Sequence, residues 1–372
     1  MNRYFIKTYG CQANVHDAAK LAGVFEGAGY RPAADEADAD FILVMTCVVR
    51  QNAEDRAAWF TQSLKGAKKQ NPNLKIGLCG CLVTEPDRDV KKQFPHVDLF
   101  VPPNSPETLQ HFLALNTKSE SRNTKQREKI RISNFEVASD FGFRASSFVS
   151  IMNGCDNYCS YCVVPYVRGR ETSRPLDEVL AEIKGLIEQG VADITLLGQN
   201  VNSYRFGLSN LLMAIQQLST LNSKFLIRFM TSHPKDLSDE LIETVARLPY
   251  VAKEFHLPLQ SGDDAILKAM NRGYTVDYYL GRLKKIRELM PAARITSDLM
   301  VGFPGETEGQ FENTLRRLEQ ARFKAVNMFA YSPRPVTAAA KMPGQVPDEV
   351  KQARLQKLIE RNRQLICYNS PV

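Results

Sequence analysis

The sequence predicts an α/β protein made of two successive units, each with a parallel sheet. Short apolar runs typical of strands alternate with longer segments of helical periodicity along most of the 372 residues. A polar stretch rich in Lys and Arg interrupts this alternation between 117 and 140. Because strands that alternate with helices form parallel sheets covered by helices, we expect one such sheet before the interruption and a second one after it.

The first unit is expected over residues 1–116. Its predicted strands are 4–9, 41–45, 74–79 and 97–101, and helical periodicity is clear at 17–26 and 53–64. Residues 117–140 are expected to form a basic linker. A solvated tether explains such a charge run, and contact with phosphates is the alternative.

The second unit is expected over residues 141–372 and ends in a charged helix at 348–365. Its predicted strands are 148–152, 193–197, 225–230, 253–257, 294–300 and 325–330. Its predicted returning helices are 176–189, 210–218, 238–248, 276–290 and 310–321. Six strands with helical returns predict a (β/α)6 partial barrel, short of the closed eight-stranded form.

Composition excludes several classes of protein. Hydrophobic residues make up 44% and charged residues 24% of the chain, as in ordinary globular proteins. No apolar run approaches the roughly 18 residues of a membrane span, and the first ten residues are too polar for a secretory signal. We therefore expect a cytoplasmic protein with no membrane partner. The net charge of +7 is compatible with a nucleic-acid partner without indicating one.

Three cysteines lie within one short stretch, at Cys155, Cys159 and Cys162. Eight cysteines in a cytosolic chain favour metal binding or catalysis over disulfides. Three thiolates on one loop can hold three irons of a four-iron cluster and leave the fourth iron open. A zinc site usually needs four ligands, and no second Cys-x-x-Cys pair accompanies Cys159 and Cys162. A disulfide loop and buried thiols are the remaining alternatives.

A second set of cysteines is spread along the first unit. Cys11, Cys47 and Cys81 each come just after one of its first three predicted strands. Because parallel strands end at a shared edge of the sheet, the three thiols can converge there. Cys79 could replace Cys81 as the third ligand, but Gly80 before Cys81 repeats the Gly–Cys pair at the first cysteine, so we favour Cys81. Independent burial of the three thiols is the alternative.

With these motifs in place, the chain resembles the methylthiotransferases of the radical S-adenosylmethionine (SAM) class over nearly its whole length. The matching stretches are 8–14, 46–55, 80–81, 155–171, 197–204, 256–262, 298–306 and 331–335. Within that family, the Tyr-Gly-Cys-Gln sequence ending at Gln12 resembles the branch that acts on tRNA. This branch modifies isopentenyladenosine beside the anticodon.

The resemblance implies a fold, an activity and a set of cofactors. The first unit would be a methylthiotransferase domain with an auxiliary cluster, and the second a radical-SAM core. The implied activity is methylthiolation of C2 of N6-(dimethylallyl)adenosine in tRNA. It would use two [4Fe–4S] clusters, held by the two sets of three cysteines, with SAM as both radical source and methyl donor. The implied partners are tRNA carrying isopentenyladenosine and a one-electron reductant such as flavodoxin or ferredoxin. The sulfur donor stays open, and we expect a monomer.

The resemblance also implies cofactor contacts at the ends of the later strands. The candidates around SAM are Tyr161, Gly198, Gln199, Asn200, Ser232, His233, Gln260 and Gly302. Each has a simpler explanation, as a core aromatic residue, a turn residue or a hydrogen-bonded loop histidine. Arg168, Arg170 and Arg174 follow the cysteine loop and are candidates for contact with tRNA phosphates. Unpartnered surface arginines are the alternative.

One departure from the family pattern concerns RNA binding. The family normally carries a small C-terminal β-barrel that grips RNA, and nothing after residue 365 is long enough to form it. We therefore expect this domain to be absent and RNA contacts to come from the core and the linker. Five residues (Ala13, Ala18, Ala19, Met45 and Val336) depart from usual family residues but remove no cysteine.

Other functions stay open at this point. The same chemistry could act on threonylcarbamoyladenosine in tRNA or on a ribosomal-protein aspartate. A non-catalytic RNA-binding iron–sulfur sensor would show the same cysteines but would form no 5′-deoxyadenosine from SAM. A zinc-binding module is the most distant alternative.

Overall fold

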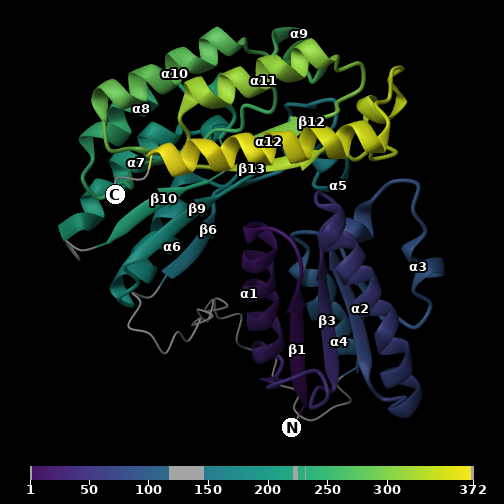
Figure 1. The fold of residues 1–372 in the computed structure, drawn as a ribbon. Helices are drawn as coiled ribbons and strands as arrows, with labels where there is room; N and C mark the ends of the chain where they lie inside the picture. The colour runs from purple at the N-terminus through teal and green to yellow at the C-terminus, as the bar shows by residue number, and fades with distance from the viewer. Residues whose placement is uncertain (1, 117–145, 221–224, 231, 370–372) are drawn as a thin grey trace. The chain divides into compact units, whose positions relative to one another are not determined.

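The computed structural model describes residues 2–116, 146–220, 225–230 and 232–369 (Figure 1). Its contacts divide the chain into two units. The first comprises Met1–Val137 together with Tyr166–Gly169, and the second comprises Ala138–Pro165 and Arg170–Val372. The linker predicted for 117–140 lies outside the described residues.

The first unit is built on a five-stranded parallel sheet in the order β2-β1-β3-β4-β5. The strands are β1 (Arg3–Thr8), β2 (Arg31–Pro32), β3 (Phe41–Thr46), β4 (Lys75–Gly80) and β5 (Leu99–Val101). The helices are α1 (Gln12–Gly27), α2 (Gln51–Gln70), α3 (Val90–Gln93) and α4 (Pro106–Asn116). All four strands predicted for this unit are present, with ends shifted by at most two residues.

The burial of the central strand, β3, shows that both faces of the sheet are covered. Every residue of β3 is buried, as expected for a parallel strand covered on both faces. Phe41, Leu43 and Met45 pack with apolar residues of α1 and α4 in one core. The alternate residues of β3 point to the other face because successive side chains alternate along a strand. Figure 1 shows α1 and α2 on opposite sides of the strands.

The second unit contains six parallel strands with helical returns. The strands are β6 (Ser146–Ser150), β9 (Asp193–Leu197), β10 (Leu226–Phe229), β11 (Glu254–His256), β12 (Arg294–Val301) and β13 (Ala325–Ala330). They form two three-stranded sheets, β10-β9-β6 and β11-β12-β13. A parallel bridge between Ile227 and Val251 joins β10 to the chain just before β11. The six strands therefore run in chain order from β6 to β13, as a partial barrel requires.

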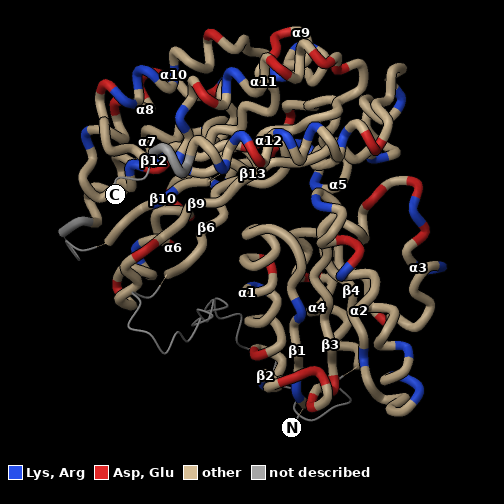
Figure 2. Tube along the Cα trace, viewed as in Figure 1, with Lys and Arg blue, Asp and Glu red and all other residues tan. Residues whose placement is uncertain are grey.

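Helices cover the outside of these strands. The longer ones are α6 (Leu176–Glu188), α7 (Leu208–Ile215), α8 (Asp239–Arg247), α10 (Val276–Leu289), α11 (Glu308–Ala321) and α12 (Asp348–Asn369). Side-chain caps begin α8 and α11: Ser238 accepts from the N–H of Leu241, and Thr307 and Gln310 form a reciprocal capping box at α11. A single apolar core extends from Val149 to Leu358 beneath them. Figure 2 shows both basic and acidic residues on α10, α11 and α12.

The predicted α/β fold class is confirmed, and so are the six strands of the second unit. Several elements were not predicted: β2, α3 and α4 in the first unit, and in the second unit the helices α5 (Val164–Val167) and α9 (Asp264–Ala269) and the antiparallel strands β7 (Met152–Asn153) and β8 (Thr172–Ser173). All of these except α4 are six residues or shorter, too brief to show a hydrophobic period. Among the described residues, no helix is long and apolar enough to cross a membrane.

Candidate metal centres

Three cysteines of the first unit lie at the carboxyl ends of three adjacent strands. Cys11 follows β1 and is the N-cap of α1, Cys47 follows β3 directly, and Cys81 opens a 3-10 turn directly after β4. β1, β3 and β4 are neighbours in the sheet, so their ends share one edge. The topology thus places three sequence-distant thiols side by side.

Two glycines make this edge possible. Gly10 has a φ of +119°, and a Cβ on it would lie 2.5 Å from the Cβ of Cys47. Gly80 has a φ of +105°, and a Cβ on it would lie 2.5 Å from the carbonyl oxygen of Thr46. Residues with a side chain rarely adopt such backbone angles, and here no space exists for one. The Gly–Cys pairs noted in the sequence therefore have a steric cause.

Side-chain hydrogen bonds tie the three cysteine turns together. Asn14, fully buried, donates from Nδ2 to the carbonyl oxygens of Tyr9 at 2.7 Å and Thr46 at 2.8 Å. Thr46 in turn donates from Oγ1 to the carbonyl of Cys79 at 2.8 Å and accepts from the N–H of Leu82 at 3.3 Å. These bonds fix the relative positions of all three turns.

The three thiols influence each other's ionisation. A hydrogen bond with Cys47 is the main cause that lowers the pKa of Cys11, to about 5, while the same bond raises the pKa of Cys47. Burial raises the pKa of Cys81, and the charge of Cys11 raises it further. Such mutual effects require the three sulfur atoms to be close together.

Cys79 differs from its neighbour Cys81. It lies inside β4, 1% exposed, opposite Met45 and Val101, and belongs to the apolar core under α1 and α4. Burial raises its pKa above the usual value. A side chain in this core is part of the packing, whereas Cys81 lies past the end of the strand.

A buried arginine completes this edge. The side chain of Arg168 is 4% exposed, and its Nη2 lies 3.1 Å from Oδ1 of Asn14 and 3.2 Å from Oδ2 of the buried Asp17. Its charge and a hydrogen bond lower the pKa of Cys81, against the larger effect of burial. The segment Tyr166–Gly169 belongs to the first unit, which explains how an arginine from so late in the sequence reaches this site.

The prediction that Arg168 contacts tRNA phosphates is therefore wrong, because a guanidinium buried against Asp17 cannot reach a polyanion in solvent. Arg174 is also engaged, through Nη1, with the carbonyl of Ser150 at 2.8 Å and with Glu182 at 2.6 Å. Arg170 keeps an 80% exposed side chain and pairs with Asp156 at 3.1 Å. Of the three arginines, it alone has an exposed guanidinium.

The second cysteine group lies in the loop after β7, at the carboxyl end of the first barrel strand. Cys155 and Cys159 are buried and Cys162 is partly buried. Burial is the main cause that raises the pKa of Cys162 to about 12, and the charges of Cys159 and Cys155 raise it further. Asn157 donates from Nδ2 to the Sγ of Cys155 at 3.4 Å. The loop thus brings its three thiols together, as its spacing predicts.

Residues more than 100 positions later hold this loop in place. Asn271 donates from Nδ2 to the carbonyls of Asn157 and Tyr158, both at 3.1 Å. Ser160 donates its N–H to Met270 at 3.0 Å and its hydroxyl to Ala269 at 2.8 Å. Tyr158 has a left-handed φ of +46°, an uncommon conformation for a large side chain that these bonds hold in place. The connection between α9 and α10 therefore acts as the support of the loop.

Arg272 lies in the same support and contacts the cysteines directly. It is 5% exposed, and its Nη1 lies 3.4 Å from Sγ of Cys159 and 3.3 Å from the hydroxyl of Tyr161. Its Nη2 donates to the carbonyl of Pro258 at 3.0 Å, and its Nε donates to the hydroxyl of Tyr274 at 3.0 Å. Nothing in the sequence marks this residue, because its partner cysteine is 113 positions away.

Buried polar atoms without partners mark the ends of β9 and β10. Within the described residues, the Oε1 of Gln199, the Oγ of Ser232 and both side-chain polar atoms of Asn202 have no hydrogen-bond partner. A buried polar atom is normally paired, so an unpaired one is a candidate for contact with a polar group of a ligand. Gln199 and Ser232 were predicted from the sequence, and Asn202 was not singled out.

His233 and Asn200 are already engaged within the fold. Asn200 donates from Nδ2 to Asp236 at 2.6 Å and accepts from the N–H of His233 at 2.9 Å. Burial, followed by the charges of Arg272 and Lys235, lowers the pKa of His233 to about 2. Its imidazole is therefore neutral, with Nε2 4.0 Å from Sγ of Cys159.

The other predicted cofactor contacts also have roles in the fold. A Cβ on Gly198 would lie 2.4 Å from Cγ of Met152, and one on Gly302 would lie 2.3 Å from Cγ of Lys351. Gln260, with a φ of +71°, pairs its backbone with Asp298 and Met300. The hydroxyl of Tyr161 accepts from Arg272. Close packing therefore already explains the two glycines.

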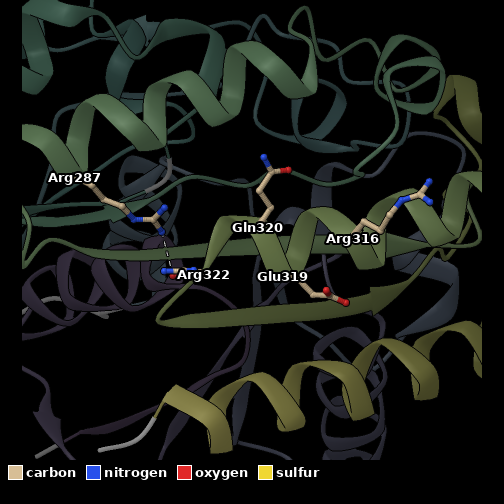
Figure 3. Close-up of a pocket in the computed structure, with 5 residues that line it drawn as sticks. All are labelled: Arg287, Arg316, Glu319, Gln320 and Arg322. Atoms are coloured by element: carbon tan, nitrogen blue, oxygen red, sulfur yellow. Dashed lines mark hydrogen bonds between the residues drawn. The ribbon is translucent and has the colours of Figure 1, made fainter.

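A surface pocket of about 590 Å³ lies elsewhere in the second unit (Figure 3). Its lining residues are Arg287, Arg316, Glu319, Gln320 and Arg322, from α10, from α11 and from the residue after it. These helix ends lead into the starts of β12 and β13. The pocket is thus at the opposite end of the strands from the cysteine loop.

In both cysteine groups the candidate ligands are thiols. In the part of the chain that the structure describes, no three His, Cys, Asp or Glu side chains are spaced to hold one metal ion. Each group offers three thiols, the donors that iron–sulfur clusters use.

Comparison with known families defines the class of the protein. Residues 149–318 match the model of the Radical SAM superfamily, and residues 3–102 match a family described as Uncharacterized protein family UPF0004. The radical SAM methyltransferase TsrM of Kitasatospora setae superposes with a TM-score of 0.65 at 15% identity, over 91% of this chain and 77% of that one. The cobalamin-dependent SAM radical enzyme OxsB gives 0.59 at 11% identity, over 97% of this chain and 56% of that one. The chain is a radical SAM enzyme.

Sequence relatives narrow the class to one family. Proteins named tRNA-2-methylthio-N(6)-dimethylallyladenosine synthase match it at 40% identity in Syntrophotalea carbinolica and 42% in Carboxydothermus hydrogenoformans. Each alignment covers 96% of this chain, and 83% and 82% of the respective relative. A third, from Thermoanaerobacter pseudethanolicus, is 43% identical over 96% of this chain and 77% of the relative. The chain belongs to this family of synthases.

Proposed function

We propose that this enzyme transfers a methylthio group to C2 of N6-(dimethylallyl)adenosine beside the anticodon of tRNA. The observation that carries the proposal is the presence of two separate groups of three cysteines, each at the carboxyl ends of strands in its own unit. Membership of the synthase family supports the substrate. One group alone would account for radical chemistry but not for the transfer of sulfur.

The cysteines divide into two ligand sets in this proposal. Cys155, Cys159 and Cys162 hold one [4Fe–4S] cluster, and Cys11, Cys47 and Cys81 hold the other. When bound, the clusters and SAM supply the radical, the sulfur and the methyl group. Three ligands in place of four leave one position on each cluster open to another molecule.

Other side chains of the second unit have defined tasks. Gln199 and Ser232 offer unpaired polar atoms to SAM at the ends of β9 and β10. His233 is neutral, so it adds no charge beside Cys159. Asn200 keeps the His233 turn in place by accepting its N–H. Arg170, exposed beside the cysteine loop in sequence, is a candidate for contact with the RNA backbone.

The proposed partners are tRNA carrying isopentenyladenosine and a one-electron reductant such as flavodoxin or ferredoxin. We propose action in the cytoplasm, where these partners are found, and as a monomer. The two cofactors can be tested together. Anaerobic reconstitution should load two clusters per chain, and reduction in the presence of SAM should yield 5′-deoxyadenosine.

The substrate is tested by mass spectrometry of tRNA from cells that lack the gene. The expected result is loss of the 2-methylthio group from dimethylallyladenosine, with recovery when the gene is returned. Loss of the same group from threonylcarbamoyladenosine instead would move the substrate assignment to that nucleoside. Unchanged 2-methylthio content in both would exclude the proposed function.

The division of labour predicts the behaviour of a Cys11→Ala variant. It should lose one cluster and all methylthio product, yet still form 5′-deoxyadenosine, because the radical-generating thiols are untouched. The readouts are iron content, 5′-deoxyadenosine by chromatography and nucleosides by mass spectrometry. A Cys159→Ala variant is the matched control and should lose both products. Loss of 5′-deoxyadenosine in Cys11→Ala would contradict the assignment.

A further inference from the structure

Arg272 is a buried charge without a carboxylate partner. It is 5% exposed, and its hydrogen-bond partners are the hydroxyls of Tyr161 and Tyr274, the carbonyl of Pro258 and Sγ of Cys159. No carboxylate among the described residues pairs with it. Taking an unpaired charge out of water costs several kcal/mol, so a site that keeps one is built to meet an opposite charge.

Three other buried or partly buried arginines, Arg168, Arg228 and Arg354, behave differently. Arg168 pairs with Asp17, and Arg354 pairs with Glu306 at 3.0 Å. Arg228, on β10, lies between Asp193 and Glu254. Each of these guanidinium groups is neutralised by a protein carboxylate. Arg272 instead points at the sulfur of Cys159.

We propose that Arg272 is the counter-charge of the cluster held by Cys155, Cys159 and Cys162, and that it favours the reduced state of that cluster. This inference rests on the proposed function, which places a cluster there. A cluster on three thiolates is anionic, and reduction adds one negative charge. A fixed guanidinium at hydrogen-bond distance from one ligand sulfur stabilises that added charge, and the effect is strong where water is excluded.

Arg272 also positions the ligand it contacts. Its guanidinium group contacts Cys159, Tyr161 and the carbonyl of Pro258, so it links the cysteine loop to the residues after β11. The hydroxyl of Tyr274 lies within hydrogen-bond distance of the same carbonyl, at 3.0 Å. Removal of the guanidinium therefore leaves Pro258 with a donor. The metal-free fold should consequently tolerate an apolar side chain at this position.

The test compares Arg272→Met, Arg272→Lys and the control Arg228→Met in the full-length, reconstituted enzyme. The midpoint potential is read by titration with electron paramagnetic resonance, using the signal that changes when SAM is added. In Arg272→Met the potential should shift to a more negative value, and 5′-deoxyadenosine should form about tenfold more slowly or worse at a fixed level of reductant. Arg272→Lys, which keeps the charge, should recover most of both. Arg228→Met should leave the potential unchanged.

Stability of the metal-free protein provides the second readout. Arg272→Met should unfold at the same denaturant concentration as the wild type or at a higher one, because it removes an uncompensated buried charge. Arg228→Met should unfold at a lower denaturant concentration, because it leaves the carboxylates of Asp193 and Glu254 without their guanidinium partner. A purely structural role for Arg272 predicts the reverse, an early-unfolding Met variant with a normal potential in whatever cluster it retains.

The outcomes separate this inference from the proposed function. A wild-type enzyme that holds no iron, or that forms no 5′-deoxyadenosine, overturns the proposed function and this inference with it. A wild-type enzyme that works, with Arg272→Met at the same potential, overturns the inference alone. If Arg272→Met holds no iron, the midpoint potential of Arg272→Lys is compared with that of the wild type. A potential close to the wild-type value supports the counter-charge, and a potential far from the wild-type value overturns it.

Discussion

The two cysteine sites are assembled by opposite means. In the first unit, the thiols come from three strand ends, and the turns that carry them are linked to one another through Asn14 and Thr46. In the second unit, the thiols share one loop, and the loop is held from outside by Asn271 and its neighbours. The first site therefore depends on the sheet itself, whereas the second depends on a distant support.

The arginines extend this comparison. Arg168 is neutralised by Asp17 whether or not a cluster is present, but Arg272 has only neutral groups and a thiol around it. Charge at the first site is balanced within the protein. At the second site, in our proposal, the cluster itself supplies the balancing negative charge. The difference suits a centre that must accept an electron during the proposed reaction.

The largest expected effect distinguishes Cys81 from Cys79. Cys81→Ala should lose one cluster, about half the iron of the reconstituted protein, because the third ligand is gone. Cys79→Ala should keep its iron, because that side chain is part of the apolar core. Iron per chain and the absorbance of the reconstituted proteins measure both. Equal iron loss in the two variants would remove the basis for choosing Cys81.

The next effect tests the charge balance of the first site. In metal-free Arg168→Met, the free energy of unfolding should fall by about 3–5 kcal/mol, because Asp17 is left as an unpaired buried charge. The double variant Arg168→Met with Asp17→Asn should recover part of that loss. Urea unfolding of the two variants and the wild type measures this. A small loss in the single variant would mean that Asp17 finds another partner or takes up a proton.

The smallest effect tests the outside support of the second site. Asn271→Gly removes two hydrogen bonds but keeps the left-handed backbone (φ +56°) of this position accessible, so the unfolding free energy should fall by only about 1 kcal/mol. Asn14→Ala is the counterpart in the first site and should cost more, because its two acceptors include the buried carbonyl of Thr46. A larger loss in Asn271→Gly would reverse the order of the two supports.

Sequence periodicity predicts most of this fold, and cysteine positions predict both thiol groups. The six barrel strands are long enough to be recognised as apolar runs. The Gly–Cys pairs at Cys11 and Cys81 predict two of the turns of the first site. Arg168, Arg272 and Asn271 could not be assigned in the same way, because their roles arise from contacts over more than 100 positions. Arg168 even looked like a surface residue, since arginine after a polar loop is usually exposed.

The hydrogen bond from the N–H of Ala339 to the carbonyl of Ser160, at 2.7 Å, has a consequence for the order of synthesis. A chain is made from its N-terminus, and its early parts fold first. The turns of Cys11, Cys47 and Cys81 are linked by residues no later than Leu82, so their frame can form early on the ribosome. The loop of Cys155, Cys159 and Cys162 gains this hydrogen bond only after residue 339 has been synthesised. Apart from Arg168, the site proposed to hold the sulfur-carrying cluster can therefore form well before the site proposed to generate the radical.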